Sequence, residues 1–347
     1  MQFGHFDDQQ REYVITDPRT PLPWINYLGS EDFFTLLSNT AGGYCFYRDA
    51  RLRRLTRYRY NNCPVDQEGF HIYIKDGKTV WNPGWQPTKT ELDRYTCRHG
   101  LGYSVIEGQK NGVSAAQTLL VPQGENCLLI RLCLKNETDI KKTLDVFPYV
   151  EFCLWDAMDD SSNFQRNFSI GEVELEPEAI YHKSEYRERR NHYAVLWANR
   201  PYDGFDTARD AFIGPYGSPA LPEAVAAGCC TGSIAHGWAP VGAMQFHLEL
   251  YPGESQELFF GLGYVENPEG EKFSAPGVIN KTRAHTMIET YRTAAQFDAA
   301  ADALRGHWDR LLSNFHAETG DEKVDRMVNI WNQYQCMVCL LYTSDAA

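Results

Sequence analysis

The sequence predicts a mainly β protein, a large sandwich of antiparallel strands followed by helices near the end of the chain. Residues 1 to about 280 contain one strand-like run after another, joined by turn residues and not by helical segments. Asp76-Gly77 and Asn111-Gly112 are strong hairpin signals between such runs. Beyond about residue 280 the apolar period lengthens to three or four residues, which is typical of helices.

The first predicted strands are short β-branched or aromatic runs. Residues 13–16 form one, and two proline steps within residues 17–21 end it. Residues 31–38 are ambiguous, because their apolar period fits a short helix as well as a strand. The runs on either side of Asp76-Gly77 and Asn111-Gly112 predict two hairpins.

Later strands are predicted from alternating apolar positions and from turn residues between the runs. These strands are expected at residues 126–134, 144–154, 173–175, 194–198, 245–250 and 257–263. They are too many for one small sandwich, so we predict a large one.

The stretch 151–172 begins as an apolar strand and then becomes polar. The polar residues that cannot be buried together are Asp156, Asp159, Asp160, Ser161, Ser162 and Asn163. They predict an excursion from the edge of a sheet. Phe164, Gln165, Arg166 and Asn167 follow, and two amides with a guanidinium group offer the planar donors and acceptors that sugar hydroxyls need. A solvated hairpin loop explains the same residues on local chemistry alone.

Three helical patterns close the chain. Apolar residues between positions 284 and 291 follow helical spacing, with Asn280 or Thr282 as the N-cap. A second apolar stripe runs from Phe297 to Phe315, and a third pattern starts at Val324. The apolar face around Trp331 predicts contact with helices beyond those of this chain.

Composition excludes several classes of function. A formal net charge of −13 argues against nucleic-acid binding, because the phosphate backbone would be repelled. No apolar stretch is long enough to predict a membrane span, and the polar N-terminus does not predict a signal peptide. The ten cysteines form no Cys/His cluster with the spacing of metal ligands, so we expect no metal site and reduced thiols in a cytoplasmic protein.

The familiar catalytic motifs are not recognisable. Gly100-Leu101-Gly102 lacks the third glycine and the helix of a dinucleotide-binding turn. The basic run 186–190, flanked by His182 and His192, fits a solvated or intersubunit charge cluster better than a phosphate site, and His99 is expected to be structural. Asp156, Asp159 and Asp160 lie too close together on one loop to flank a glycosidic bond as acid and base.

Six long segments resemble the cellobiose phosphorylases of glycoside hydrolase family 94. They are REYVITDPRTPLPWINYLG (11–29), SNTAGGYCFYRDARLRRLTRYRYNN (38–62), CRHGLGYS (97–104), FQRNFSIGEVE (164–174), YRERRNHYA (186–194) and VDRMVNIWNQYQCMV (324–338). The resemblance implies a β super-sandwich at residues 1–278 and a helical linker at 279–318. It also implies the first helix of a truncated (α/α)6 barrel at 319–338, and residues 339–347 depart from the family and are expected to be a non-native tail.

The same resemblance implies a function for the full-length parent. Such enzymes cleave cellobiose with phosphate and invert the anomeric centre, giving α-glucose 1-phosphate and glucose. They need no cofactor, because inorganic phosphate is the co-substrate, and they act as homodimers. Their catalytic acid and phosphate-binding groups lie on the barrel, so this chain is expected to contain no catalytic residue and to be inactive alone.

The resemblance assigns substrate binding to the loop at residues 164–167. Arg166 and Gln165 are expected to bond hydroxyls of the acceptor glucose in the dimer partner, with Asn167 in support and Phe164 as a packing anchor. Two other functions remain open. A stand-alone carbohydrate-binding sandwich would bind sugar without a barrel, and a glycoside hydrolase would need a second carboxylate to activate water.

Overall fold

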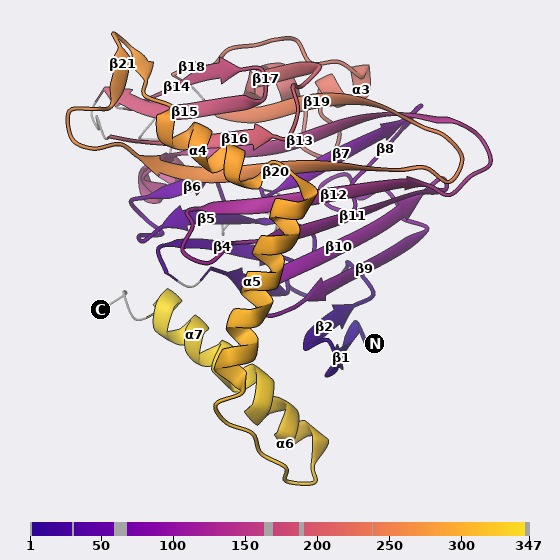
Figure 1. The fold of residues 1–347 in the computed structure, drawn as a ribbon. Coiled ribbons are helices and arrows are strands. Elements are labelled where there is room, and N and C mark those ends of the chain that lie inside the picture. The colour runs from indigo at the N-terminus through magenta and orange to yellow at the C-terminus, as the bar shows by residue number, and fades with distance from the viewer. Residues whose placement is uncertain are drawn as a thin grey trace.

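The computed structural model describes residues 2–29, 31–58, 68–162, 169–186, 191–237 and 239–343. Two large antiparallel sheets face each other, and helices cover their outer sides (Figure 1). The prediction of a large, mainly β sandwich with helices near the end of the chain is therefore confirmed.

The N-terminal hairpin forms one edge of the first sheet. Within the described residues it has eleven strands, in the spatial order β1 (Gly4–Asp7), β2 (Glu12–Ile15), β9 (Arg94–His99), β10 (Tyr103–Lys110), β11 (Val113–Leu120), β12 (Cys127–Asn136), β20 (Ser255–Glu266), β16 (His192–Ala198), β15 (Ala179–Tyr186), β14 (Ser169–Glu176) and β18 (His236–Gly237). The predicted hairpin between β10 and β11 is confirmed. Asn111 and Gly112 both have a positive φ there, 52° and 71°, as a type I′ turn requires.

The second sheet packs behind the first. Over the described residues its path is β17 (Gly204–Ala208), β19 (Pro240–Leu250), β13 (Lys142–Trp155), β6 (Arg54–Thr56), β5 (Gly43–Tyr47), β4 (Phe33–Ser38) and β3 (Ile25–Leu28), with β7 (His71–Asp76) pairing both β13 and β8 (Thr79–Trp81). The ambiguous residues 31–38 contain strand β4. All six residues of β4 are buried, which removes the alternation that would have marked it as a strand.

The main core lies between the two sheets. Along β12, Leu128, Ile130, Leu132 and Leu134 point into it, whereas Cys127 and Leu129 point to the opposite face. This alternation is the period of two that a strand imposes on its side chains. A central strand with apolar residues on both faces is therefore covered on both sides.

Helices cover the outer face of the first sheet. They are α4 (Thr282–Tyr291) and α5 (Ala294–Leu312). Helix α6 (Glu322–Arg326), the π-helical turn η2 (Met327–Trp331) and helix α7 (Asn332–Thr343) follow at the end of the sandwich, where α6 contacts the N-terminal hairpin and α7 contacts β3. Phe297, Leu304 and Trp308 of α5 face this sheet, and the rings of Phe297 and Phe259 lie 5.8 Å apart. A capping box of Thr293 and Gln296 starts α5, and Oδ1 of Asn280 accepts from the backbone N–H of Thr282 at the start of α4.

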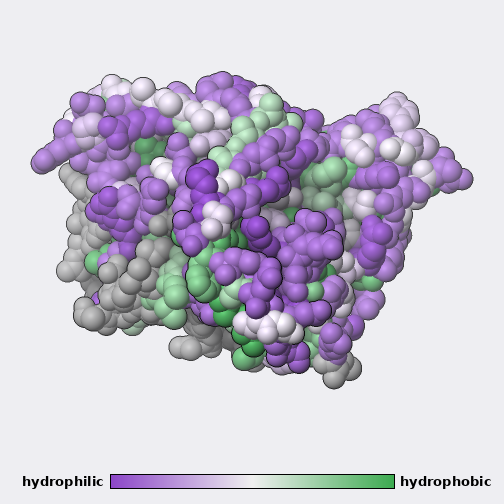
Figure 2. Space-filling view, turned by 60° about the horizontal axis from the view of Figure 1, so that its bottom comes forward, coloured by the Kyte–Doolittle hydropathy of each residue, from purple (hydrophilic) through white to green (hydrophobic). Residues whose placement is uncertain are grey.

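Two expectations about these helices were wrong. Phe315 lies beyond the end of α5 and is 57% exposed, so it does not extend the apolar stripe. Trp331 is only 8% exposed and packs on Phe6, with ring centroids 5.7 Å apart, so the sandwich itself covers it. A stripe shows which face of a helix is apolar, but not which element covers that face. Figure 2 turns the lower end of the molecule in Figure 1 toward the viewer, and hydrophobic residues lie between hydrophilic ones on that surface.

Short elements complete the fold. Helices α2 (Arg209–Ile213) and α3 (Glu223–Ala227) cover part of the outer face of the second sheet, where Phe212 stacks on Tyr149 at 4.8 Å. The hairpin of β21 (Phe273–Ala275) and β22 (Val278–Ile279) precedes α4. The helix α1 (Ala157–Ser162) follows β13 directly. The domain boundaries given above stay predictions.

Candidate functional site

The predicted sugar-binding residues, Phe164, Gln165, Arg166 and Asn167, lie outside the described residues, and their role stays a prediction. The chain on both sides of them is described. Helix α1 comes before them and strand β14 comes after them. The structure can therefore show how the two ends of the predicted loop are held.

Helix α1 starts at a sharp change of direction. Trp155, the last residue of β13, has a positive φ of 71°, which a bulky residue rarely adopts. Oδ1 of the next residue, Asp156, accepts from the backbone N–H groups of Met158 and Asp159 at 2.9 and 3.1 Å. Asp156 thus caps the first turn of α1. The polar excursion predicted after β13 begins with this short helix.

Asp160 is the only buried side chain of α1. Its two carboxylate oxygens accept from Nε and Nη2 of Arg57, both at 2.7 Å. The two side chains are only 3–4% exposed. The expectation that this acidic group stays out of the protein interior was therefore wrong for Asp160. An ion partner 103 residues away, which local sequence does not reveal, makes its burial possible.

A second carboxylate holds Arg57 from the other side. Glu151 on β13 accepts from Nη1 of Arg57 at 3.2 Å and from Nε of Arg209 at 2.8 Å. The hydroxyl of Tyr149 also donates to Glu151, at 2.8 Å. Burial favours the neutral acid, but Arg209 and Arg57 together hold the pKa of Glu151 below its usual range. Glu151 is thus charged at neutral pH and holds Arg57 in place.

The histidines that flank the basic run 186–190 lie beside these charges. His182 stacks on the ring of Phe152, with centroids 4.9 Å apart and planes 13° apart, and neither of its ring nitrogens has a partner among the described residues. Burial, the larger cause, and the charge of Arg57 together lower the pKa of His182 to about 3. Nδ1 of His192 lies 3.1 Å from the hydroxyl of Tyr264. Residues 187–190 of the run are outside the described part, so its role stays a prediction.

We expect acid to destabilise the fold through buried histidines. Burial lowers the pKa of His182 to about 3 and that of His99 to about 4, from an ordinary value of 6.5. Below pH 6.5 the unfolded chain therefore binds more protons than the folded chain does. The free energy of unfolding should fall as pH drops from about 6.5 to about 4, by up to ~1.4 kcal/mol per pH unit for each histidine.

Melting temperature measured against pH tests this expectation. His182→Leu should flatten the slope in that window, whereas the same change at the exposed His236 should leave it as it is. A slope that His182→Leu does not alter would show that His182 plays no part.

A cleft of about 570 Å³ adjoins the same end of the sandwich. Tyr47 and Tyr264 stack there with ring centroids 4.1 Å apart. Arg53 pairs with Glu266 at 3.2 Å, and an ion pair with Asp32 occupies Arg48, which also lines the cleft. Because two of its guanidinium groups already have carboxylate partners, the cleft does not present a strong positive charge.

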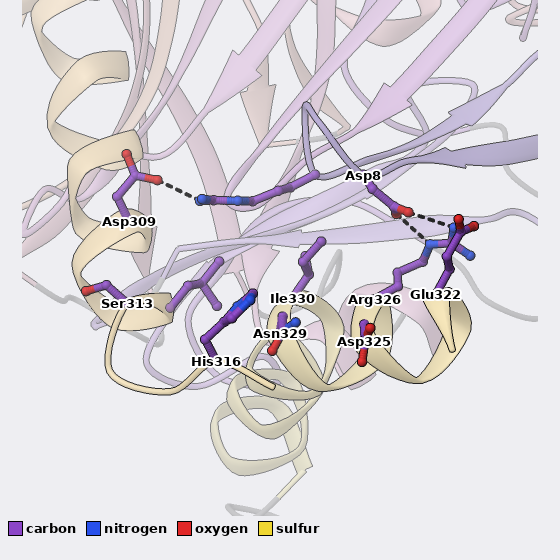
Figure 3. Close-up of a pocket in the computed structure, with 11 residues that line it drawn as sticks. Asp8, Asp309, Ser313, His316, Glu322, Asp325, Arg326, Asn329 and Ile330 are labelled. Carbon is purple, nitrogen blue, oxygen red and sulfur yellow. Dashed lines mark hydrogen bonds and ion pairs between the residues drawn. The ribbon is translucent and has the colours of Figure 1, made fainter. Parts of the chain in front are cut away.

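A second polar cavity, of about 550 Å³, lies where the N-terminal hairpin meets the last helices (Figure 3). Arg326 binds both carboxylate oxygens of Asp8, at 2.5 and 2.7 Å, and Arg11 donates to Asp309 at 2.6 Å. These pairs join residues about 300 positions apart. The cavity is thus a junction between the sandwich and the helices.

A buried hydrogen-bond network fastens α7 to the sandwich above this junction. The hydroxyl of Tyr334 donates to Oδ1 of Asn26 at 2.6 Å and accepts from the backbone N–H of Tyr27 at 2.9 Å. The amide of Asn26 donates to Oγ of Ser104 at 3.0 Å, and Oγ of Ser104 lies 2.8 Å from Nδ1 of His99. His99 is therefore structural in its surroundings, since its other nitrogen lies 3.1 Å from the carbonyl of Trp24.

Four of the six resembling segments supply residues to these two places. Residues 11–29, 97–104 and 324–338 supply Asn26, Ser104 and Tyr334 of the network around α7. Residues 38–62 supply Arg57, which holds α1 at the start of the segment 164–174. Sequence reasoning missed Arg57, Glu151, Asn26 and Tyr334 as site residues. Arg57, Asn26 and Tyr334 lie inside resembling segments, which was the available signal, whereas Glu151 lies in none of them.

Within the described ranges, no group of three His, Cys, Asp or Glu side chains has the geometry of a metal site. Of the helices in those ranges, none combines the length and apolar character that crossing a bilayer requires.

Two family descriptions match the chain. Residues 11–294 match the description "Glycosyl hydrolase 94, supersandwich domain", and residues 307–347 match "Glycosyl hydrolase 94 superfamily, catalytic domain". The first match covers most of the chain and includes both sheets except for strand β1. The second begins within α5 and includes the helices that follow it.

Curated relatives align along the whole chain. It is 35% identical to an N,N'-diacetylchitobiose phosphorylase of Vibrio furnissii and 33% identical to one of Vibrio proteolyticus, with 100% of this chain and 42% of each relative covered. It is 28% identical to a 3-O-beta-D-glucopyranosyl-beta-D-glucuronide phosphorylase of Paenibacillus borealis, over 97% of this chain and 41% of that protein. The chain thus spans less than half the length of these relatives.

Proposed function

Because the chain belongs to glycoside hydrolase family 94, we propose that it is the N-terminal part of a disaccharide phosphorylase. The observation that carries this proposal is the alignment of the whole chain with phosphorylases at 35% and 33% identity. The complete protein would use phosphate to split a disaccharide into a sugar 1-phosphate and a free sugar. This chain would contribute the sandwich and the start of the catalytic domain.

Two disaccharides are the leading substrates. The resembling segments point to cellobiose, with α-glucose 1-phosphate and glucose as products. The two Vibrio relatives act on N,N'-diacetylchitobiose, and their identity to this chain supports that disaccharide as the second candidate. The two substrates share a β-linked pair of pyranose rings and differ in the acetamido groups.

The proposed chemistry divides between the chain and the rest of the protein. A carboxylic acid outside this chain would protonate the glycosidic oxygen while phosphate attacks the opposite face of the anomeric carbon. Phosphate is already an anion, so a general base is not needed. Gln165, Arg166 and Asn167 would bind the acceptor sugar of the partner subunit in a cytoplasmic homodimer.

Product analysis of the complete protein tests this function. The protein is incubated with cellobiose or N,N'-diacetylchitobiose, with and without phosphate, and sugar 1-phosphate is measured. We expect release of sugar 1-phosphate only when phosphate is present, and the faster substrate identifies the disaccharide. Release of two free sugars without phosphate would indicate a hydrolase. Sugar binding without any cleavage would indicate a carbohydrate-binding sandwich.

Arg166→Ala tests the acceptor site. In the synthetic direction we expect the acceptor KM to rise roughly 10- to 100-fold, because one or two charge-assisted hydrogen bonds are lost. Arg19→Ala is the matched control, since the exposed Arg19 pairs with Asp17 at a distance from the loop in sequence. An acceptor KM that stays at the wild-type value would contradict the assignment of Arg166.

A further inference from the structure

Among the described residues, helix α1 makes few of the apolar contacts that usually hold a helix to a protein. Its sequence is AMDDSS, and its largest apolar side chain, Met158, is 58% exposed. Six residues are too few for a helix that is stable by itself in water. Its only buried side chain is the charged Asp160. The contact with Arg57 is therefore the main side-chain contact that fixes α1 on the sandwich.

Arg57 is itself held rigidly. Its backbone N–H donates to the carbonyl of Glu151 at 2.8 Å, and its Nη1 donates to the carboxylate of Glu151 at 3.2 Å. Arg209 holds Glu151 in turn, at 2.8 Å. Arg209, Glu151, Arg57 and Asp160 thus form a row of alternating charges from the second sheet to α1. Such a row fixes the orientation of its last member.

Stability alone does not explain a buried pair of this kind. Taking two charges out of water costs about as much as their attraction returns, and apolar side chains of similar volume often stabilise a fold equally well. The planar fork of Arg57 bonds both oxygens of Asp160, which fixes the direction of the carboxylate as well as its distance. The main effect of the Arg57–Asp160 pair is therefore to fix the position of α1, and its contribution to the stability of the fold is secondary.

We propose that Arg57 and Asp160 are positioning residues for the acceptor sugar. They fix the place and direction in which the chain leaves α1 at residue 162, three residues before Gln165. This inference rests on the proposed function, because the acceptor role of Gln165 and Arg166 is part of that function. A displacement on the order of 1 Å at a substrate-positioning group lowers rates by up to ~100-fold.

Kinetics of the complete protein in the synthetic direction test the proposal. Asp160→Asn and Arg57→Lys should raise the acceptor KM about tenfold or more and leave the KM of the sugar 1-phosphate donor within about twofold, since the donor binds elsewhere. Lysine should not rescue the function, because it lacks the fork that bonds both oxygens. Asp32→Asn is the matched control, since it breaks a bidentate pair with Arg48 that is exposed and does not involve α1.

A double variant separates positioning from stability. Arg57→Met with Asp160→Leu removes both charges and should restore most of the melting temperature that Arg57→Met alone loses. Positioning requires that the acceptor KM stay high in this double variant. An acceptor KM that returns to the wild-type value together with the melting temperature would overturn the proposal.

Hydrogen exchange on the same proteins gives a readout that needs no activity. Asp160→Asn should speed amide exchange in residues 157–162 and leave α3 unchanged. Unchanged exchange in α1 would overturn the proposal whatever the kinetics show. If the wild-type protein makes no sugar 1-phosphate, the proposed function and the acceptor role both fail. Faster exchange in α1 would then still show that the pair holds this helix.

Discussion

Replacing Arg57 with methionine is expected to lower the free energy of unfolding by about 3–5 kcal/mol. The change leaves the carboxylate of Asp160 buried without its partner and removes one of the two arginines that bind Glu151. An uncompensated buried charge is among the most destabilising changes that a fold can undergo. Chemical or thermal unfolding of the purified protein that contains these residues measures the effect.

The exposed arginine at position 48 supplies the control. It forms a bidentate pair with Asp32 at 2.8 and 2.7 Å, but the two side chains are 61% and 42% exposed. Arg48→Met should therefore change the free energy of unfolding by less than about 1 kcal/mol. Equal losses in the two variants would show that burial of the Arg57–Asp160 pair has no special effect.

Replacing Asn26 with leucine should destabilise the fold by about 3 kcal/mol, the sum of more than one unsatisfied buried group. The Asn26 amide donates to the carbonyls of Gly100 and Tyr103, at 2.9 and 2.8 Å, and its oxygen accepts from the hydroxyl of Tyr334. Leucine satisfies none of these groups. We also expect α7 to exchange its amide hydrogens faster, because one of the two hydrogen bonds between Tyr334 and β3 is lost.

Tyr334→Phe is the matched comparison for Asn26→Leu. It removes the hydroxyl that bonds Asn26 and the backbone N–H of Tyr27 but leaves the amide of Asn26 bonded, so a loss of about 1–2 kcal/mol is expected. In the double variant the losses should not add, because the two side chains share one hydrogen bond. Simple additivity of the two losses would show that the Asn26–Tyr334 bond contributes nothing to stability.

Local chemistry explains why much of the fold was predictable. The turn at Asn111-Gly112 needs two residues with positive φ, and this dipeptide is the one most often found there. These two residues are therefore enough to predict the hairpin. Alternation likewise revealed β12, because Arg131, Cys133 and Lys135 stay at least partly exposed between its buried leucine and isoleucine residues. The strand β4 was ambiguous because every residue in it is buried. The surroundings of Trp331 were predicted wrongly, because an apolar stripe on a helix does not show which part of the protein packs against it.

The site was less predictable because its contacts join distant parts of the chain. Asp160 was expected to be solvated, and nothing within several residues of it signals an ion partner at Arg57. Asn26 and Ser104 look like ordinary turn or strand residues until Tyr334 is placed beside them. The resembling segments marked the right neighbourhoods, but a single sequence does not show which segments touch.

The bond between Asn26 and Tyr334 also has a consequence for the order of synthesis. The two residues are 308 positions apart, so at ribosomal rates of 5–20 residues per second roughly 15–60 s separate their appearance. During that interval the hydrogen-bonding groups of Asn26 that later meet α7 face water or a chaperone. Strand β12 likewise waits for β20, its partner in the first sheet, which begins at Ser255. The nascent chain therefore carries an incomplete sandwich until β20 has been made, and a ribosome that pauses before residue 255 holds the first sheet open along β12.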